Sequence, residues 1–416
     1  MTDPRFTRRA FLTVAGGAGA TLLAACLRLA PSSSAAPGGA STSAATPSAP
    51  PTLAPTPAEV PLRAKIAQML LVGFRGTDAA SASAILADIS ERGLGGVVLF
   101  SVDQPSGSSV RNIVSPGQLA ALTATLQDAG ARPTSDPGRH PLLIAVDQEG
   151  GQVARLGPDH GFPPTVSAAQ LGAQEDPRAT RQAGRDIART LRDAGINLNL
   201  APVVDLDLNP ANPIIGALDR SFGADPALVQ RQAAAFIDGH REIGVWTTLK
   251  HFPGHGSATG DTHLGVVDVT DTWQPIELQP FRELIADGHA QAILTAHVFN
   301  ARLDPQHPAT LSRATITGIL RRQLGWRGVV ISDDMQMGAI RDAYGYADAL
   351  RLAILAGVDI LTIANQPVFE EGIVGETIEL VAGMVKDGSI PERRITESWL
   401  RITALRRAIA TGEALG

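Results

Sequence analysis

The chain has 416 residues, of which 44% are hydrophobic and 4% aromatic, and its formal net charge is −6. Nucleic-acid binders usually carry a basic patch or stripe, so this balance predicts no nucleic-acid partner. The low aromatic content also leaves few side chains on which a polymeric sugar or a single-stranded nucleic acid could stack. A compact binding pocket is therefore favoured.

The N-terminal segment predicts export. It contains the pair Arg8-Arg9, then small apolar residues, then Cys26, the only cysteine. This order is similar to a twin-arginine signal peptide that ends in a bacterial lipobox, which implies a lipidated Cys26 on the outer face of the cytoplasmic membrane. A transmembrane anchor is the alternative, but the apolar span 10–27 is marginal in length for crossing a bilayer.

Residues 27–60 predict a linker. They are mostly Pro, Ala, Ser, Thr and Gly, which cannot bury enough apolar surface to offset the entropy of ordering. We therefore expect a signal peptide over 1–26, a tether over 27–60 and one folded domain over 61–416. Membrane contact would then be made through the lipid anchor only.

From Pro61 onward, short apolar runs alternate with helical patterns. Asp-Pro pairs at 176–177 and 225–226 predict helix starts, and Gly195, Gly244 and Gly357 predict helix ends. Eight such strand–helix units favour an α/β fold built as a single (β/α)8 TIM-type barrel over an open doubly wound sheet. The candidate strands are 69–74, 96–100, 142–147, 196–200, 245–250, 292–295, 329–333 and 358–362.

Polar residues follow several of these strands. In a barrel of this type the working groups lie at the carboxyl ends of the strands, so the polar groups should converge on one rim. They are Asp147, Lys250, His251, His297, Asp333 and Asp334.

The segment 250–263, KHFPGHGSATGDTH, is the richest in chemistry. Its glycines indicate a loop, and Asp261 can orient His263 as a proton carrier near neutral pH. A solvated histidine beside a capping aspartate is equally compatible with the pair alone. Zinc bound by the loop's histidines is a further alternative, although their spacing matches no common zinc pattern.

Two more segments offer carboxylates. Asp333 directly follows the apolar run GVVIS, which would hold it rigidly, while Asp334 is better placed to brace the next loop. A helix N-cap is the structural alternative for either residue. In VDQEGGQVARL (146–156), Asp147, Glu149 and Arg155 surround a Gly-Gly turn suited to recognising hydroxyl groups, or to a surface ion pair. The glycine runs lack the patterns of nucleotide-binding loops.

These segments together resemble the family 3 glycoside hydrolases, in particular their bacterial β-N-acetylglucosaminidase branch. The match runs from about Pro61 to Ala410 in order, and the segment from KHFPGHG to DTH is highly specific. The segments that carry it are QMLLVGF (68–74), VDQEGGQVARL, NLNLAPVVDL (197–206), DRSFG (219–223), LKHFPGHGSATGDTH (249–263), TAHV (295–298) and GVVISDDMQMG (328–338).

The resemblance implies roles for particular residues. Asp333 would be the nucleophile, His263 the acid/base and Asp261 its orienting partner. The sugar would be held by Asp147, Arg155, Arg220, Lys250 and His251. Two departures are Gln152, where arginine is usual, and Thr262, where serine is common; neither group would make or break bonds.

The expected activity is retaining, exo-acting hydrolysis of terminal β-linked N-acetylglucosamine from muropeptide or chitin-type oligosaccharides, with no metal or organic cofactor. A phosphorylase, a broader β-glycosidase and a non-enzymatic tethered sugar-binding protein are alternatives. The sequence does not decide the oligomeric state, although a monomer is compatible with it.

Overall fold

The computed structural model describes residues 60–131 and 140–413. The predicted signal peptide with Cys26, and nearly all of the predicted linker, lie outside the described residues. Within them, no helix is both long enough and apolar enough to cross a bilayer.

Nine of the described strands form two parallel sheets, and the remaining four form two-stranded pairs, β9 (Val267–Asp268) with β11 (Val298–Phe299) and β4 (Gln148–Gly150) with β5 (Val153–Ala154). The larger has six strands in the order β13 (Leu361–Ile363), β1 (Leu70–Gly73), β2 (Gly96–Leu99), β3 (Leu143–Val146), β6 (Leu198–Asn199) and β7 (Trp246–Thr247). The smaller has the order β12 (Val329–Ile331), β10 (Ala292–Thr295) and β8 (Leu249–Phe252). Every predicted strand position contains a strand, which confirms the α/β fold with parallel pairing.

One predicted strand differs from the expectation. The run 245–250 is divided between β7, which pairs with β6 in the larger sheet, and β8, which pairs with β10 in the smaller one. Only Thr248 separates the two strands, and the β8–β10 register is irregular. At the other border, Ile331 and Ile360 form an isolated parallel bridge. The strand pairing therefore defines two adjoining sheets and not the single closed sheet that we expected.

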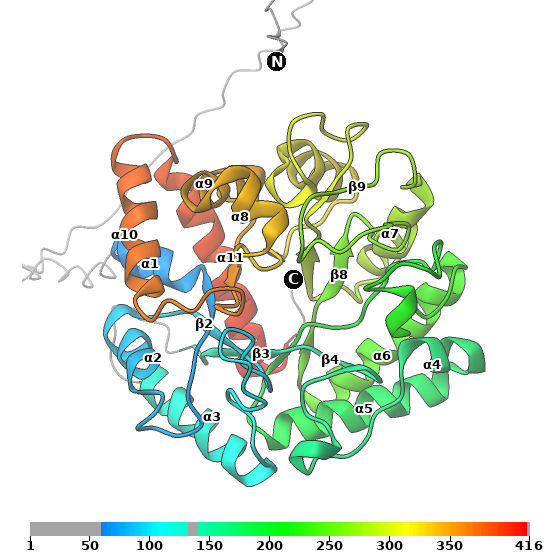
Figure 1. The fold of residues 1–416 in the computed structure, drawn as a ribbon, viewed down its shortest axis with the longest axis horizontal. Helices are drawn as coiled ribbons and strands as arrows, with labels where there is room; N and C mark the ends of the chain where they lie inside the picture. Colours follow the sequence, from blue (N-terminus) through cyan, green and yellow to red (C-terminus); the bar gives the residue numbers. More distant parts are fainter. Residues whose placement is uncertain (1–59, 132–139, 414–416) are drawn as a thin grey trace, which may run out of the picture. The chain divides into compact units, whose positions relative to one another are not determined.

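Helices surround the strands on the outside (Figure 1). The predicted helix starts are confirmed, because Asp176 and Asp225 each accept a hydrogen bond from backbone N–H groups in the first turn of α5 and α6. The helices are α1 (Leu62–Gln68), α2 (Ser83–Ala87), α3 (Pro116–Gly130), α4 (Ala168–Gln174), α5 (Pro177–Asp193), α6 (Pro226–Ile243), α7 (Gln279–Ala286), α8 (Gly338–Tyr344), α9 (Tyr346–Ala356), α10 (Ile373–Lys386) and α11 (Glu392–Thr411).

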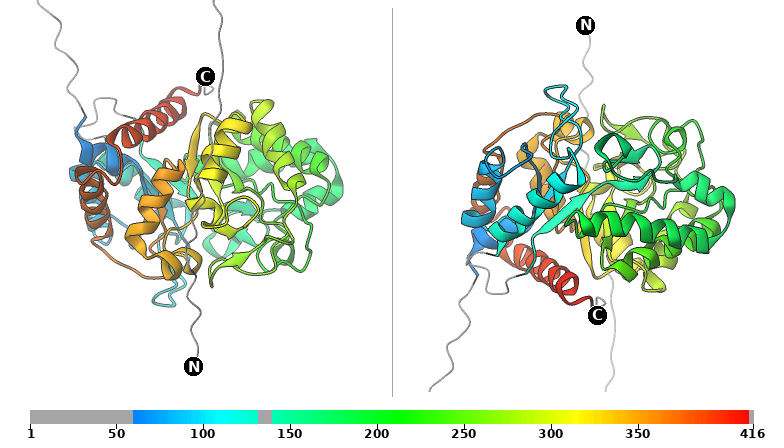
Figure 2. Two further views of the ribbon diagram at one scale, coloured as in Figure 1. Left: turned by 90° about the horizontal axis from the view of Figure 1, so that it is seen from above. Right: turned by 90° about the horizontal axis from the view of Figure 1, so that it is seen from below.

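Shorter elements occur in the connections. They include the strands β4 (Gln148–Gly150), β5 (Val153–Ala154), β9 (Val267–Asp268) and β11 (Val298–Phe299), the π-helices η1 (Asp88–Arg92) and η6 (Ala314–Gln323), and the 3₁₀ turns η2 (Pro158–His160), η3 (Gly216–Leu218), η4 (Pro275–Leu278) and η5 (Ala309–Leu311). Helix α1 packs on α10 and α11, so the two ends of the domain lie together (Figure 2).

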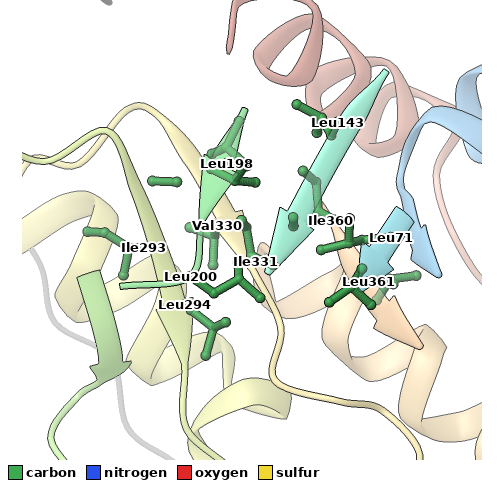
Figure 3. Close-up of a cluster of buried hydrophobic side chains, with 14 of the residues drawn as sticks. Leu71, Leu143, Leu198, Leu200, Ile293, Leu294, Val330, Ile331, Ile360 and Leu361 are labelled. Carbon is green, nitrogen blue, oxygen red and sulfur yellow. The ribbon is translucent and has the colours of Figure 1, made fainter. Parts of the chain in front are cut away.

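The core lies between the strands of the two sheets. Leucine, isoleucine and valine side chains from both sheets meet there in one buried cluster, which Figure 3 shows around Leu71, Leu198, Ile293 and Val330. Parallel strands buried on both faces read as continuous apolar runs, which is why the strand positions were visible in the sequence.

A buried aspartate joins the strand layer to the last helix. Asp359 is fully buried and accepts hydrogen bonds from the guanidinium groups of Arg321, Arg394 and Arg401 and from the hydroxyl of Ser398. Burial by itself raises the pKa of Asp359, but the three arginines outweigh it and hold the pKa below its usual range.

We expect Asp359→Ala to cost about 3–5 kcal/mol of unfolding free energy, because it leaves buried guanidinium groups without their partner. The control is Asp348→Ala on α9, which removes an exposed pair with Arg351 and should cost less than about 1 kcal/mol. Denaturant unfolding of the variants measures both values. Equal costs for the two substitutions would contradict the structural role of Asp359.

Candidate active site

A pocket of about 180 Å³ opens at the carboxyl ends of the strands. Its floor is formed by core side chains of the strand layer, including Val98, Leu200 and Leu294. Seven of the predicted site residues line it and come from loops far apart in the sequence. They are Asp147, Arg155, Arg220, Lys250, His251, His263 and Asp333.

Lys250 is the centre of a buried ion network on one wall. Its side chain is 3% exposed, and its Nζ lies 2.7 Å from Asp147 Oδ1 and 2.6 Å from Glu149 Oε1. Arg220 holds the same glutamate with two parallel bonds, both of 2.7 Å. The network thus fixes the loops after β3 and β6 against β8.

The network favours the charged forms of Glu149 and Lys250. Burial by itself raises the pKa of Glu149, but Arg220 and Lys250 outweigh it and hold that pKa far below its usual range. Burial likewise lowers the pKa of Lys250, but Asp147 and Glu149 outweigh it and raise the pKa overall. A buried wall of fixed charges can hold sugar hydroxyl groups at little cost in reorganisation when the ligand binds.

His251 is oriented by a residue that the sequence analysis did not single out. Asp205 is fully buried, and its Oδ2 lies 2.7 Å from His251 Nδ1. Its carboxylate also accepts hydrogen bonds from the backbone N–H groups of His251 and His255. Because arginine can only donate, the 3.3 Å contact between Arg220 Nη2 and His251 Nε2 makes Nε2 the acceptor and Nδ1 the donor to Asp205.

The Asp261–His263 pair is formed as predicted. Asp261 Oδ1 accepts hydrogen bonds from the His263 backbone N–H at 2.8 Å and from its Nδ1 at 2.6 Å. The His263 side chain is 61% exposed. Its carbonyl accepts a hydrogen bond from Gly338 N, and that of Thr262 accepts one from Ala339 N, so the loop is docked on the first residues of α8.

That docking brings His263 to the same pocket as Asp333, which lies five residues before Gly338 in the chain. Asp333 accepts a hydrogen bond from the backbone N–H of Asp334, and among the described residues no cation forms an ion pair with it. Burial by itself raises the pKa of Asp333, but His297, His251 and His263 outweigh it and hold the pKa below its usual range. Asp333 is thus a carboxylate open to the pocket.

Asp334 has the bracing position expected of it. Its Oδ1 accepts hydrogen bonds from the backbone N–H groups of Gln336 and Ala364, tying the loop after β12 to the loop after β13. Burial raises the pKa of Asp334 to about 6, and the charge of Asp333 acts in the same direction. The two neighbouring carboxyl groups are therefore held in different environments.

One sequence-based interpretation needs correction, and one alternative can be compared with the structure. His297 does not line the pocket; it is fully buried, and its Nε2 contacts the carbonyl of Asp334 at 2.9 Å. The zinc alternative also lacks support in the described part of the chain, where no group of three or more His, Cys, Asp or Glu could hold a metal ion. His255 is buried within the segment 250–263 and contributes to the pocket lining, with its Nε2 3.5 Å from Thr262 Oγ1.

Comparisons with known proteins agree with this geometry. Residues 61–405 match the glycosyl hydrolase family 3 N-terminal domain. A beta-hexosaminidase from Tolumonas auensis is 38% identical over 275 residues, which is 65% of this chain and 76% of that protein.

Two solved structures are similar. A family 3 beta-N-acetylglucosaminidase from Paenibacillus sp. is 36% identical with a TM-score of 0.75; the match covers 86% of this chain and 65% of that one. A beta-N-acetylhexosaminidase from Beutenbergia cavernae is 32% identical with a TM-score of 0.74; the match covers 84% and 99%. The chain belongs to glycoside hydrolase family 3 and is a hydrolase.

We expect Asp205→Asn to lower kcat/KM for an aryl glycoside on the order of 100-fold, because misplacing a positioned group by about 1 Å has that effect. An amide cannot accept from all three N–H groups around Asp205 at once. The control is Asp207→Asn, two residues away, whose Oδ1 has no hydrogen-bond partner among the described residues. Steady-state kinetics and thermal unfolding of both variants provide the measurement. Unchanged kinetics in Asp205→Asn would contradict the orienting role.

Proposed function

We propose that the protein is a retaining, exo-acting β-N-acetylhexosaminidase that releases terminal β-linked N-acetylglucosamine. The observation that carries the proposal is that Asp333, a carboxylate, and His263, polarised by Asp261, line one pocket. The names of the similar proteins support the same substrate class.

In the first step, Asp333 attacks the anomeric carbon, and the bond to the leaving oxygen breaks while His263 donates a proton to that oxygen. In the second step, His263 removes a proton from water, which attacks the anomeric carbon and releases the sugar from Asp333. The lowered pKa of Asp333 supports the first step, because the group remains an ionised nucleophile. No cofactor is required by either step.

The ion network supplies the proposed sugar site. Its side chains present hydrogen-bond donors and acceptors toward the pocket. A ligand without matching hydroxyl groups would leave these buried groups unpaired and would therefore bind weakly. The residues proposed to hold the sugar are Asp147, Arg155, Arg220, Lys250 and His251. The apolar floor closes the pocket at the strand layer, which supports binding at the end of an oligosaccharide rather than along it.

We also propose that the two sheets act as one (β/α)8-type barrel around this pocket. The isolated parallel bridges Val203–Lys250 and Ile331–Ile360 support that reading, because they continue the strand pairing across both borders of the sheets. The convergence of strand ends on one pocket is the functional property of such a barrel.

We expect Asp333→Ala to lower kcat for an aryl β-N-acetylglucosaminide by on the order of 10⁴-fold or more, as for loss of a nucleophile in other enzymes. The matched control is Asp342→Ala, an exposed aspartate on α8, which should retain full activity. Turnover is followed by release of the aryl group. Near-normal hydrolysis by Asp333→Ala would refute the assignment.

The same assay separates the alternatives. A neutral histidine base tolerates an incoming phosphate, so sugar 1-phosphate formed on addition of inorganic phosphate would identify a phosphorylase. Equal rates on the aryl glucoside would identify a broader β-glycosidase. Absence of turnover by the unaltered protein, with sugar binding retained, would identify a binding protein. The open Asp333 carboxylate supports an enzyme.

For the location, we propose export as a lipoprotein anchored on the outer face of the cytoplasmic membrane, with residues 27–60 as tether. The proposal rests on the sequence pattern around Arg8-Arg9 and Cys26. Cell-wall muropeptides or chitin fragments would then be the accessible substrates, and kinetics on defined muropeptides and on chitobiose distinguish them.

Mass spectrometry of the protein isolated from membranes checks the anchor. We expect a mature N-terminus at Cys26 that carries acyl chains. A Cys26→Ala variant should stay uncleaved and unmodified. An unmodified Cys26 within an uncleaved natural chain would contradict the proposal.

A further inference from the structure

A second buried carboxyl group lies behind the loop that carries His263. Glu277 on η4 is 1% exposed. Its Oε1 accepts hydrogen bonds from Ser257 Oγ at 2.7 Å and from the backbone N–H of Gln274 at 3.0 Å. Its Oε2 is buried and has no partner among the described residues. No step of the proposed reaction uses this group.

Glu277 is in close contact with residues 254–257, the first half of the loop that carries His263. A Cβ added to Gly254 would lie 2.7 Å from Glu277 Cβ and 2.8 Å from Oε2, so the loop backbone contacts the carboxyl group. Two residues further along, a Cβ added to Gly256 would lie 1.7 Å from the carbonyl oxygen of Leu206. Residues 254–257 are therefore clamped between Glu277 and the segment after β6, and only glycine fits at both contacts.

The clamped half of the loop is connected to the half that carries the proposed acid/base. His255 lies in the clamp, and its Nε2 contacts Thr262 Oγ1 at 3.5 Å. Thr262 directly precedes His263. A shift of the Gly254–Ser257 backbone would therefore be transmitted to His263, whose side chain is largely exposed and is held by its hydrogen bond to Asp261.

The charge state of Glu277 affects this clamp. Burial raises the pKa of Glu277 to about 7, and the negative charge of Asp205 acts in the same direction, while the bonds from Ser257 and Gln274 oppose them. The other titratable group of the clamp is His255, whose pKa burial lowers to about 4, so it supplies no compensating positive charge. Below about pH 7 the carboxyl group is neutral, and the proton resides on Oε2 because Oε1 accepts two hydrogen bonds.

We propose that Glu277, in its neutral form, is a positioning residue that holds the Gly254–Ser257 backbone in place. The fixed backbone keeps His263 within reach of the leaving oxygen. The inference rests on the proposed role of His263 as acid/base. Ionisation of Glu277 places an unpaired negative charge in the clamp beside Asp205. The loop then relaxes to solvate that charge, and proton donation by His263 weakens.

The test compares kcat/KM for two β-N-acetylglucosaminides. A 2,4-dinitrophenyl leaving group departs without a proton, whereas a methylumbelliferyl group needs the acid. His263→Ala should therefore lose about 100-fold or more on the methylumbelliferyl substrate and far less on the dinitrophenyl one. Glu277→Ala should show the same selectivity, with a loss of about 10-fold or more on the methylumbelliferyl substrate.

Glu277→Gln is the conservative variant, because its amide oxygen can accept the two bonds and it is neutral at every pH. At pH 5.5 it should match the unaltered enzyme. As the pH rises through about 7, its kcat/KM on the methylumbelliferyl substrate should exceed that of the unaltered enzyme, since only the latter ionises Glu277. The matched control is Glu283→Gln on α7, the same chemical change outside the clamp, which should follow the unaltered enzyme at each pH.

The outcomes are distinguishable. An equal loss on both substrates in Glu277→Ala, or a constant ratio of Glu277→Gln to unaltered activity across pH, overturns the positioning role. A selective loss in His263→Ala without one in Glu277→Ala overturns this inference alone. No selectivity in His263→Ala overturns both the proposed mechanism and the inference. If Glu277→Ala does not fold, the pH ratio of Glu277→Gln decides.

Discussion

The pairing of Lys250 with Asp147 and Glu149 is the interaction on which the site depends. An ammonium group that is 3% exposed is tolerated only when nearby carboxylates offset the loss of its hydration. Those carboxylates come from the loop after β3, and Glu149 in turn holds Arg220 from the loop after β6. One buried charge therefore fixes three connections relative to each other, and the pocket wall is rigid before any ligand binds.

A second layer of buried acids supports this wall. Burial by itself raises the pKa of Asp205, but His251 and His255 outweigh it and hold that pKa below its usual range, whereas burial raises the pKa of Glu277 to about 7. The difference follows from the partners that each carboxyl group finds. Between the two acids run the glycines of the loop, where any side chain would collide with the protein backbone or with Glu277. The glycines of this loop are thus explained by close packing, and the polar residues at its two ends by the groups that line the pocket.

Much of the fold could be predicted because parallel strands leave continuous apolar runs in the sequence. The division of 245–250 into β7 and β8 could not, since it depends on which neighbour each residue meets: Trp246 pairs with Leu198, and Leu249 with Ile293. In the site, Asp261 and His263 were predictable because the pair is local. Asp205 was not, because its partner His251 lies 46 residues further along the chain and they meet only through folding. The aspartate that ends the run APVVD was the available signal.

The sequence by itself determined the family, the strand positions and the residues that we propose for proton transfer and nucleophilic attack, because each of these is written in contiguous segments. The tertiary structure decided which polar groups share a pocket, which hydrogen-bond partners Asp333 and Asp334 each have there, and that His297 is buried outside the pocket lining. The tertiary burial of Glu277 also raised the pKa of its carboxyl group. Burial, partner distance and local charge are properties of groups brought together from distant parts of the chain, and no single segment contains them.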